Sequence, residues 1–198
     1  MTETIDPRRA ALLVMDYQNG VVDMLDEPDD LLARAGNAIA TVRGAGGHVG
    51  YVRVAFEDAD LESFPPTSGM GRRVGASGQA LHNDSPNTAV HERVAPEPGD
   101  IIVRKVRVGA FSTTDLDAQL RERGVDTLIL AGISTSGVVL STVRDASDRD
   151  YRVLVLADAT ADPDPEVHAF LTERIFPRQT DVITVADLDG LLVHADPE

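Results

Sequence analysis

The chain has 198 residues, 42% of them hydrophobic and none of them cysteine, and its formal net charge is −15. This length fits one domain with a sizeable core, and the lack of cysteine excludes disulfides, thiolate metal sites and thiol nucleophiles. The acidic balance disfavours nucleic acid and anionic lipid as partners. Without a long apolar run or a signal-peptide pattern, we expect a cytoplasmic protein with no membrane partner.

Short apolar runs alternate with helical patterns along most of the chain. The runs predict strands over 10–16, 48–55, 100–105, 125–132, 151–157 and 181–185. Apolar residues at helical spacing predict helices over 30–46, 115–123, 165–175 and the stretch that follows Gly132. This alternation indicates an α/β fold with a parallel sheet and helices on both of its faces.

Residues 57–99 form the least regular segment, which is rich in proline and glycine. We place the whole chain, 1–198, in a single domain and interpret 57–99 as a lid or a partner-contact arm, with a plain insertion containing a short helix as the alternative. Arg53 interrupts the apolar pattern just before this segment, and we expect its side chain to face solvent rather than the pocket.

The stretch 128–139 reads as a buried strand, a tight polar turn and the first turn of a helix. Gly132 breaks the apolar run, and Thr135 and Ser136 are residue types that cap helix N-termini. A helix that begins here directs free backbone N–H groups toward the space above the strand.

Two charged residues end predicted strands elsewhere in the chain. Asp16 follows the first strand and Lys105 ends the third. Because the carboxyl ends of parallel strands share one side of a sheet, both residues can meet the turn after Gly132. An aspartate, a lysine and free N–H groups together offer a proton carrier, a fixed charge and oxyanion donors. Asp16 as a simple turn residue is the alternative.

Three separated motifs carry a resemblance to a known family. They are Ala11-Leu-Leu-Val-Met-Asp16, the block 105–116, and Leu130-Ala-Gly-Ile-Ser-Thr-Ser-Gly-Val-Val-Leu-Ser-Thr142. In order and spacing the chain resembles the isochorismatase-like hydrolase superfamily over nearly its whole length, apart from 57–99. The resemblance implies a three-layer α/β/α, Rossmann-like fold with a six-stranded parallel sheet. It also implies a homodimer or larger homo-oligomer and a cis peptide at Ile133–Ser134 that shapes an oxyanion hole.

The chain departs from the amidase members of this superfamily at one position. Where those members carry a cysteine nucleophile, this chain has Val138, so the usual triad is reduced to Asp16 and Lys105. Isochorismatases of the superfamily also lack the cysteine, and the resemblance to them implies a mechanism in which the aspartate protonates a vinyl ether. A serine substitute is disfavoured, because the turn is not a G-x-S-x-G elbow and no motif places a histidine beside it.

The resemblance and the strand ends together assign a candidate site. The catalytic residues are Asp16 and Lys105. The turn residues are Gly132, Ile133, Ser134, Gly137 and Val138, and the substrate-binding residues are Gln18, Phe111 and Ser136. We expect no metal, because the five histidines show no ligand spacing, and no other cofactor.

These residues predict a hydrolase that acts on a small-molecule substrate without a covalent thiol intermediate. An isochorismate-like vinyl ether and a small cyclic amide are both compatible with an aspartate and a lysine as the acid–base pair. The alternative is a catalytically inactive protein of the same fold that binds a small molecule or a protein partner.

Overall fold

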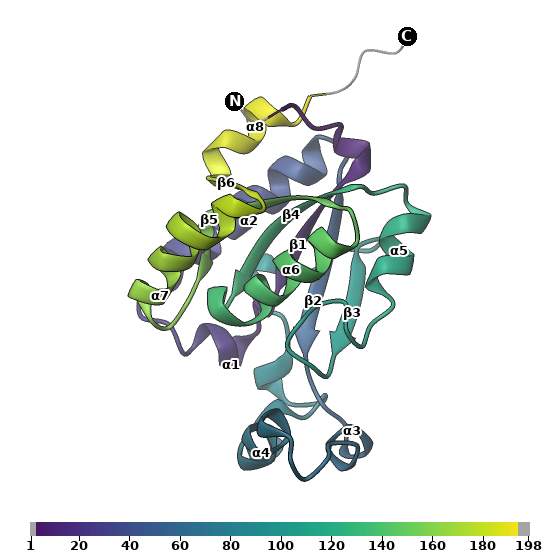
Figure 1. Ribbon diagram of the computed structural model, residues 1–198, viewed down its shortest axis with the longest axis vertical. Coiled ribbons are helices and arrows are strands. Elements are labelled where there is room, and N and C mark those ends of the chain that lie inside the picture. Colours follow the sequence, from purple (N-terminus) through teal and green to yellow (C-terminus); the bar gives the residue numbers. More distant parts are fainter. Residues whose placement is uncertain (1–2, 194–198) are drawn as a thin grey trace.

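The computed structural model describes residues 3–193, whose strands form one six-stranded, all-parallel sheet in the order β3-β2-β1-β4-β5-β6 (Figure 1). The strands are β1 (Ala10–Met15), β2 (His48–Val54), β3 (Ile101–Lys105), β4 (Thr127–Ile133), β5 (Arg152–Ala161) and β6 (Asp181–Ile183). The predicted α/β fold with a six-stranded parallel sheet is confirmed.

Helices cover both faces of this sheet, with α5 and α6 in front of it and α2 behind it in Figure 1. The α-helices are α1 (Asn19–Val22), α2 (Asp29–Gly44), α3 (Asp58–Glu62), α4 (Gly69–Ala76), α5 (Leu116–Glu122), α6 (Leu140–Asp148), α7 (Pro165–Phe170) and α8 (Leu188–Leu191). Single π-helical turns span Thr135–Val139 and Leu171–Ile175, and 3₁₀ turns span Pro7–Arg9, Gly78–Leu81, Pro86–Thr88, Glu92–Val94, Phe176–Arg178 and Val185–Asp187.

The central strands are apolar along their whole length because both of their faces are covered. In β1, Leu12 and Val14 pack toward α2, whereas Leu13 and Met15 pack toward α5 and α6. All six residues of β1 and all seven of β4 are buried. Both strands run through the middle of the sheet, so their carboxyl ends lie at its centre. Within residues 3–193, no helix is long and apolar enough to cross a membrane.

The segment 57–99 divides into two parts. The first part carries α3 and α4, which project beyond the ends of β2 and β3 in Figure 1. The second part, which follows α4, lies against the chain that leaves β1. There, His91 N–H donates to the Tyr17 carbonyl at 2.8 Å, and Gln18 pairs with Val90 in an isolated β-bridge.

The expectation that Arg53 faces solvent is wrong. Its Nε donates to the Thr88 carbonyl at 3.2 Å, and its Nη2 donates to the Asn83 carbonyl at 3.1 Å. The guanidinium therefore ties the end of β2 to the second part of the segment. An alternating strand pattern predicts which face a side chain occupies, but it does not predict that a distant loop covers that face.

Candidate active site

Asp16 and Lys105 meet at the carboxyl ends of β1 and β3, although β2 lies between these strands. Lys105 Nζ lies 2.9 Å from Asp16 Oδ2, and only 3% of the lysine side chain and 8% of the aspartate side chain are exposed. Asp16 leaves β1 with φ 57°, a left-handed conformation that aspartate tolerates better than most residues. This left-handed backbone conformation directly after the buried strand places a carboxylate at the carboxyl end of a central strand.

The two oxygens of Asp16 have different surroundings. Oδ2 pairs with Lys105, whereas Oδ1 is buried and has no hydrogen-bond partner among the residues that the structure describes. Burial raises the pKa of the Asp16 carboxyl above its usual value of 3.8, and the attraction of Lys105 only partly opposes this shift. Buried polar atoms are seldom left without a partner, so Oδ1 is suited to bind a water molecule or a substrate.

The turn after β4 lies beside Asp16, because Met15 and Gly132 are register partners in neighbouring strands. The peptide bond between Ile133 and Ser134 is cis. A side chain at Gly132 does not fit, since a Cβ atom there would lie 2.7 Å from Val139 Cγ2 and 3.3 Å from Met15 Cβ. The glycine allows the start of the next helix to pack directly on the strand.

The backbone N–H groups of the turn differ in their availability. Ser136 N–H donates to Asp162 Oδ2 at 2.8 Å, and Gly137 N–H donates to the Ser134 carbonyl at 3.2 Å. The N–H groups of Ser134 and Thr135 have no acceptor within residues 3–193. Among the predicted turn residues, Ser134 therefore has a free N–H donor within the described chain, and Thr135 N–H joins it.

The predicted capping role of Thr135 and Ser136 is wrong. Ser134 occupies the N-cap position, and no side chain of residues 3–193 caps the π-helical turn that follows it. Thr135 Oγ1 instead lies 2.8 Å from Nδ1 of His168, and Ser136 Oγ donates to Asp162 Oδ2 at 2.7 Å. These partners come from the region after β5, more than 25 positions away, so local propensity carries no signal for them.

Two of the predicted substrate-binding residues have other partners in the structure. Gln18 is buried, and its amide donates to the Val54 and Thr88 carbonyls and accepts from Val54 N–H. Phe111 stacks on Tyr151, which precedes β5 at the opposite ends of the strands. Both side chains therefore already have partners within the fold, and of the three predicted substrate-binding residues only Ser136 belongs to the turn.

Val138 is 2% exposed and packs in the apolar cluster between the sheet and α6, which also contains Met15 and Val139. Its side chain can bring neither a nucleophile nor a proton carrier to the turn. Within residues 3–193, no group of three or more histidine, cysteine, aspartate or glutamate side chains is placed to hold a metal ion. Asp16 and Lys105 are thus the buried acid–base pair at the carboxyl ends of the strands.

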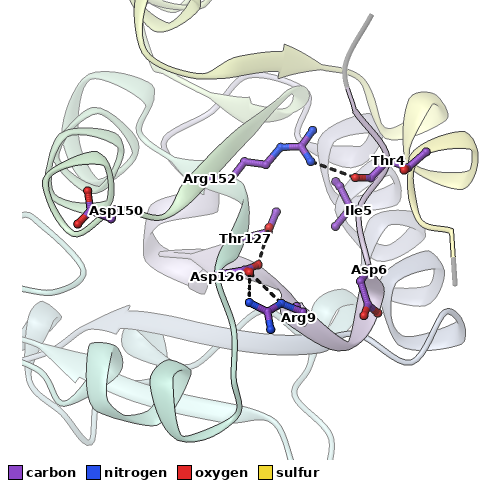
Figure 2. Close-up of a pocket in the computed structure, with 8 residues that line it drawn as sticks. All are labelled: Thr4, Ile5, Asp6, Arg9, Asp126, Thr127, Asp150 and Arg152. Carbon is purple, nitrogen blue, oxygen red and sulfur yellow. Dashed lines mark hydrogen bonds and ion pairs between the residues drawn. The ribbon is translucent and has the colours of Figure 1, made fainter. Parts of the chain in front are cut away.

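A hollow of about 380 Å³ lies at the opposite end of the strands from Asp16, near their amino ends. Figure 2 shows Arg9 and Arg152 in this hollow with their polar partners, the side chain of Asp126 and the carbonyl of Thr4. Its two arginines are already paired, Arg9 with Asp126 and Arg152 with Asp181, so they are less available to a reaction than the buried pair of Asp16 and Lys105.

Comparison with known proteins agrees with this architecture. Ureidoacrylate amidohydrolase RutB of Methylobacterium radiotolerans is 36% identical over 182 residues, which cover 82% of this chain and 70% of that protein. A cysteine hydrolase from Pseudomonas syringae pv. phaseolicola superposes with a TM-score of 0.83 at 28% identity, covering 96% of this chain and 94% of that one. N-carbamoylsarcosine amidase from Thermoplasma acidophilum gives a TM-score of 0.72 at 28% identity, covering 89% and 96%. The isochorismatase domain model matches residues 10–187, and the chain is therefore a member of the isochorismatase family of hydrolases.

Proposed function

We propose that this protein hydrolyses an amide bond in a small ureido or N-carbamoyl compound, with water rather than a thiol as the nucleophile. One observation carries the proposal: a buried aspartate pairs with a lysine through one oxygen, and its other oxygen has no partner in the part of the chain that the structure describes. Two relatives support the substrate class, because they are named as a ureidoacrylate amidohydrolase and an N-carbamoylsarcosine amidase.

In the proposed reaction Asp16 is the general base. Its Oδ1 takes a proton from a water molecule while the water oxygen bonds to the carbonyl carbon of the substrate. A raised pKa makes the carboxylate a better base than an ordinary aspartate. The protonated Asp16 then gives this proton to the leaving nitrogen as the carbon–nitrogen bond breaks, which restores the carboxylate.

Two further groups stabilise the charge in this scheme. The Lys105 ammonium beside Oδ2 keeps the aspartate from becoming too weak an acid for the second proton transfer. The free N–H groups of Ser134 and Thr135 would donate to the oxyanion of the tetrahedral intermediate.

A second reaction uses the same residues in the opposite protonation state. A carboxyl with a raised pKa can protonate the carbon of a vinyl ether, after which water adds to the cation and the ether bond breaks. The raised pKa and the apolar Val138 in place of a nucleophile favour this reaction for an isochorismate-like substrate.

Product analysis by mass spectrometry tests the proposal. The purified protein and its Asp16→Asn variant are incubated separately with ureidoacrylate, N-carbamoylsarcosine, a panel of small cyclic amides, and isochorismate. We expect ammonia and carbon dioxide, or a carbamate, from a ureido compound with the unmodified protein only. Pyruvate from isochorismate would support the second reaction. No turnover by either protein, together with saturable binding of a panel compound, would support the non-catalytic alternative.

A further inference from the structure

The turn after β4 has neighbours on two sides. Asp16 lies on the β1 side, and on the β5 side the turn meets the loop and helix that follow β5. Two side chains from that region, Asp162 and His168, bond to the turn. Neither residue is needed as an acid or a base in the reaction proposed above, so their contacts require a separate explanation.

The contact between Thr135 and His168 is largely enclosed. Thr135 is fully buried, and its Oγ1 lies 2.8 Å from Nδ1 of the half-buried His168. Beside it, the N–H and the hydroxyl of Ser136 both donate to one oxygen of Asp162, at 2.8 and 2.7 Å. Two successive turn residues are thus held by partners outside their own helix.

The helix itself holds this turn weakly. Among the described residues, no side chain caps the π-helical turn or α6, so the usual local interaction that fixes a helix N-terminus is missing there. The two free N–H groups, of Ser134 and Thr135, lie at the same place. Whatever fixes the orientation of Thr135 therefore also fixes the donors that would face the developing oxyanion.

The imidazole is suited to this structural contact. Burial lowers the pKa of His168 below its usual value of 6.5, with Asp162 opposing the shift. The ring is consequently neutral at pH 7, and a neutral imidazole has one donor and one acceptor nitrogen. An uncharged ring that bonds to a hydroxyl can hold the turn without adding a charge beside the reaction.

We infer that His168, through its hydrogen bond to Thr135, is a positioning residue that fixes the oxyanion-binding turn. This inference rests on the proposed function for its effect on turnover, but the contact and its effect on the turn backbone exist without it. Misplacing a reacting group by about 1 Å can lower a rate by about 100-fold, so a small rotation of these N–H groups is enough to matter.

Four variants test the inference. Thr135→Val removes the hydroxyl at nearly constant shape, and His168→Leu removes the imidazole. Thr135→Ser keeps the hydroxyl and is the conservative rescue. Thr172→Val is the matched control, because Thr172 Oγ1 donates to the carbonyl of His168 and so bonds to the same residue without touching the turn. Thermal unfolding of each variant shows whether it folds.

The kinetic readout is the separation of kcat from KM. We expect Thr135→Val and His168→Leu each to lower kcat by about 10- to 100-fold with little change in KM. The double variant should be no worse than the poorer single variant, since both changes delete the same bond. Thr135→Ser should recover most of the kcat that Thr135→Val loses, and Thr172→Val should retain wild-type kcat. A loss of kcat in Thr172→Val equal to that in Thr135→Val would overturn the inference.

The second readout needs no substrate. Backbone amide chemical shifts are measured by NMR for the folded variants. We expect shifts of the Ser134 and Thr135 amides in His168→Leu, and none in Thr172→Val. Unchanged Ser134 and Thr135 amides would contradict the inference, whether or not the unmodified protein turns over any compound. If the amides shift but no substrate is hydrolysed, the proposed function fails and the positioning contact stands.

Discussion

Asp16 and Lys105 at the carboxyl ends of the strands can be compared with Asp126 and Arg9 at the amino ends. Both pairs join an acid to a base across neighbouring parts of one sheet. The side chains of Arg9 and Asp126 are 59% and 43% exposed, and they line an open hollow (Figure 2). Asp16 and Lys105 are almost fully buried, and one oxygen of Asp16 lacks a partner within the described chain.

The difference shows that neither a hollow nor an ion pair identifies a reactive site by itself. In the exposed pair, water screens both charges, and such pairs contribute about 0–1 kcal/mol to stability. In the buried pair, the loss of solvent raises the pKa of Asp16 and strengthens every charge interaction around it. Burial combined with an unpartnered oxygen is what makes the carboxyl ends the better place for acid–base chemistry.

The largest effect is expected from Asp16→Asn. The amide keeps the shape of the carboxylate but cannot accept a proton, so kcat should fall by about 10²- to 10⁴-fold, the usual contribution of a general acid–base group. Steady-state kinetics on the compound identified by product analysis measure the change. Activity retained within twofold would remove Asp16 from the mechanism.

A large loss of stability is expected from Lys105→Met. The methionine leaves a carboxyl group buried without its cation, and breaking a buried pair in this way costs about 3–5 kcal/mol. Urea unfolding monitored by circular dichroism measures the free energy of unfolding. The double variant, Lys105→Met with Asp16→Asn, should recover part of the loss; if it is less stable than the single variant, the pair is not coupled as described.

The pH dependence of kcat/KM distinguishes the two reactions proposed for this pair. A general base must be ionised, so amide hydrolysis should increase as pH rises through the pKa of Asp16, which burial places above 3.8. A general acid must be protonated, so vinyl ether hydrolysis should decrease over the same range. For a ureido substrate we expect the increase; a decrease would contradict Asp16 as the base.

A smaller effect is expected from Gly132→Ala. The added methyl group would lie 2.7 Å from Val139 Cγ2, and relief of this overlap should cost about 1–3 kcal/mol and displace the turn. Gly44→Ala is the matched control, because a Cβ at Gly44 meets no atom within 4 Å. Thermal unfolding and kcat are measured for both. Equal stability of the two variants would show that the turn is not tightly packed on β4.

The smallest effect is expected at the amino ends. Arg9→Met breaks the exposed pair with Asp126 and should change the free energy of unfolding by less than about 1 kcal/mol. It should leave kcat and KM unchanged. A loss of activity comparable with that of Asp16→Asn would mean that the hollow of Figure 2 contributes to the reaction after all.

The sequence predicts the parts of the site that depend on position along a strand. Asp16 and Lys105 are found where apolar runs stop, and parallel strands necessarily bring such positions to one side of a sheet. Side-chain partners are set by packing between distant segments and were missed. Three contacts are examples: the hydrogen bond from Gln18 to Thr88, the stacking of Phe111 on Tyr151, and the hydrogen bond between Thr135 and His168.

The strand boundaries show the same limit on a smaller scale. The strand predicted over 151–157 continues as β5 to Ala161, because a register shift between Leu130 and Gly132 lets β4 and β5 pair again beyond it. No local pattern in 158–161 indicates this continuation, which depends on the neighbouring strand.

The most direct test of the central claim is the intact mass of the protein during turnover of its substrate, measured by rapid quenching and mass spectrometry. If water attacks the substrate directly, product accumulates while the mass of the chain stays constant at every time point. A transient increase equal to the acyl or carbamoyl group, carried by a serine or threonine of the turn, would show a covalent intermediate and would contradict the assignment of Asp16 and Lys105 as a pair that activates water.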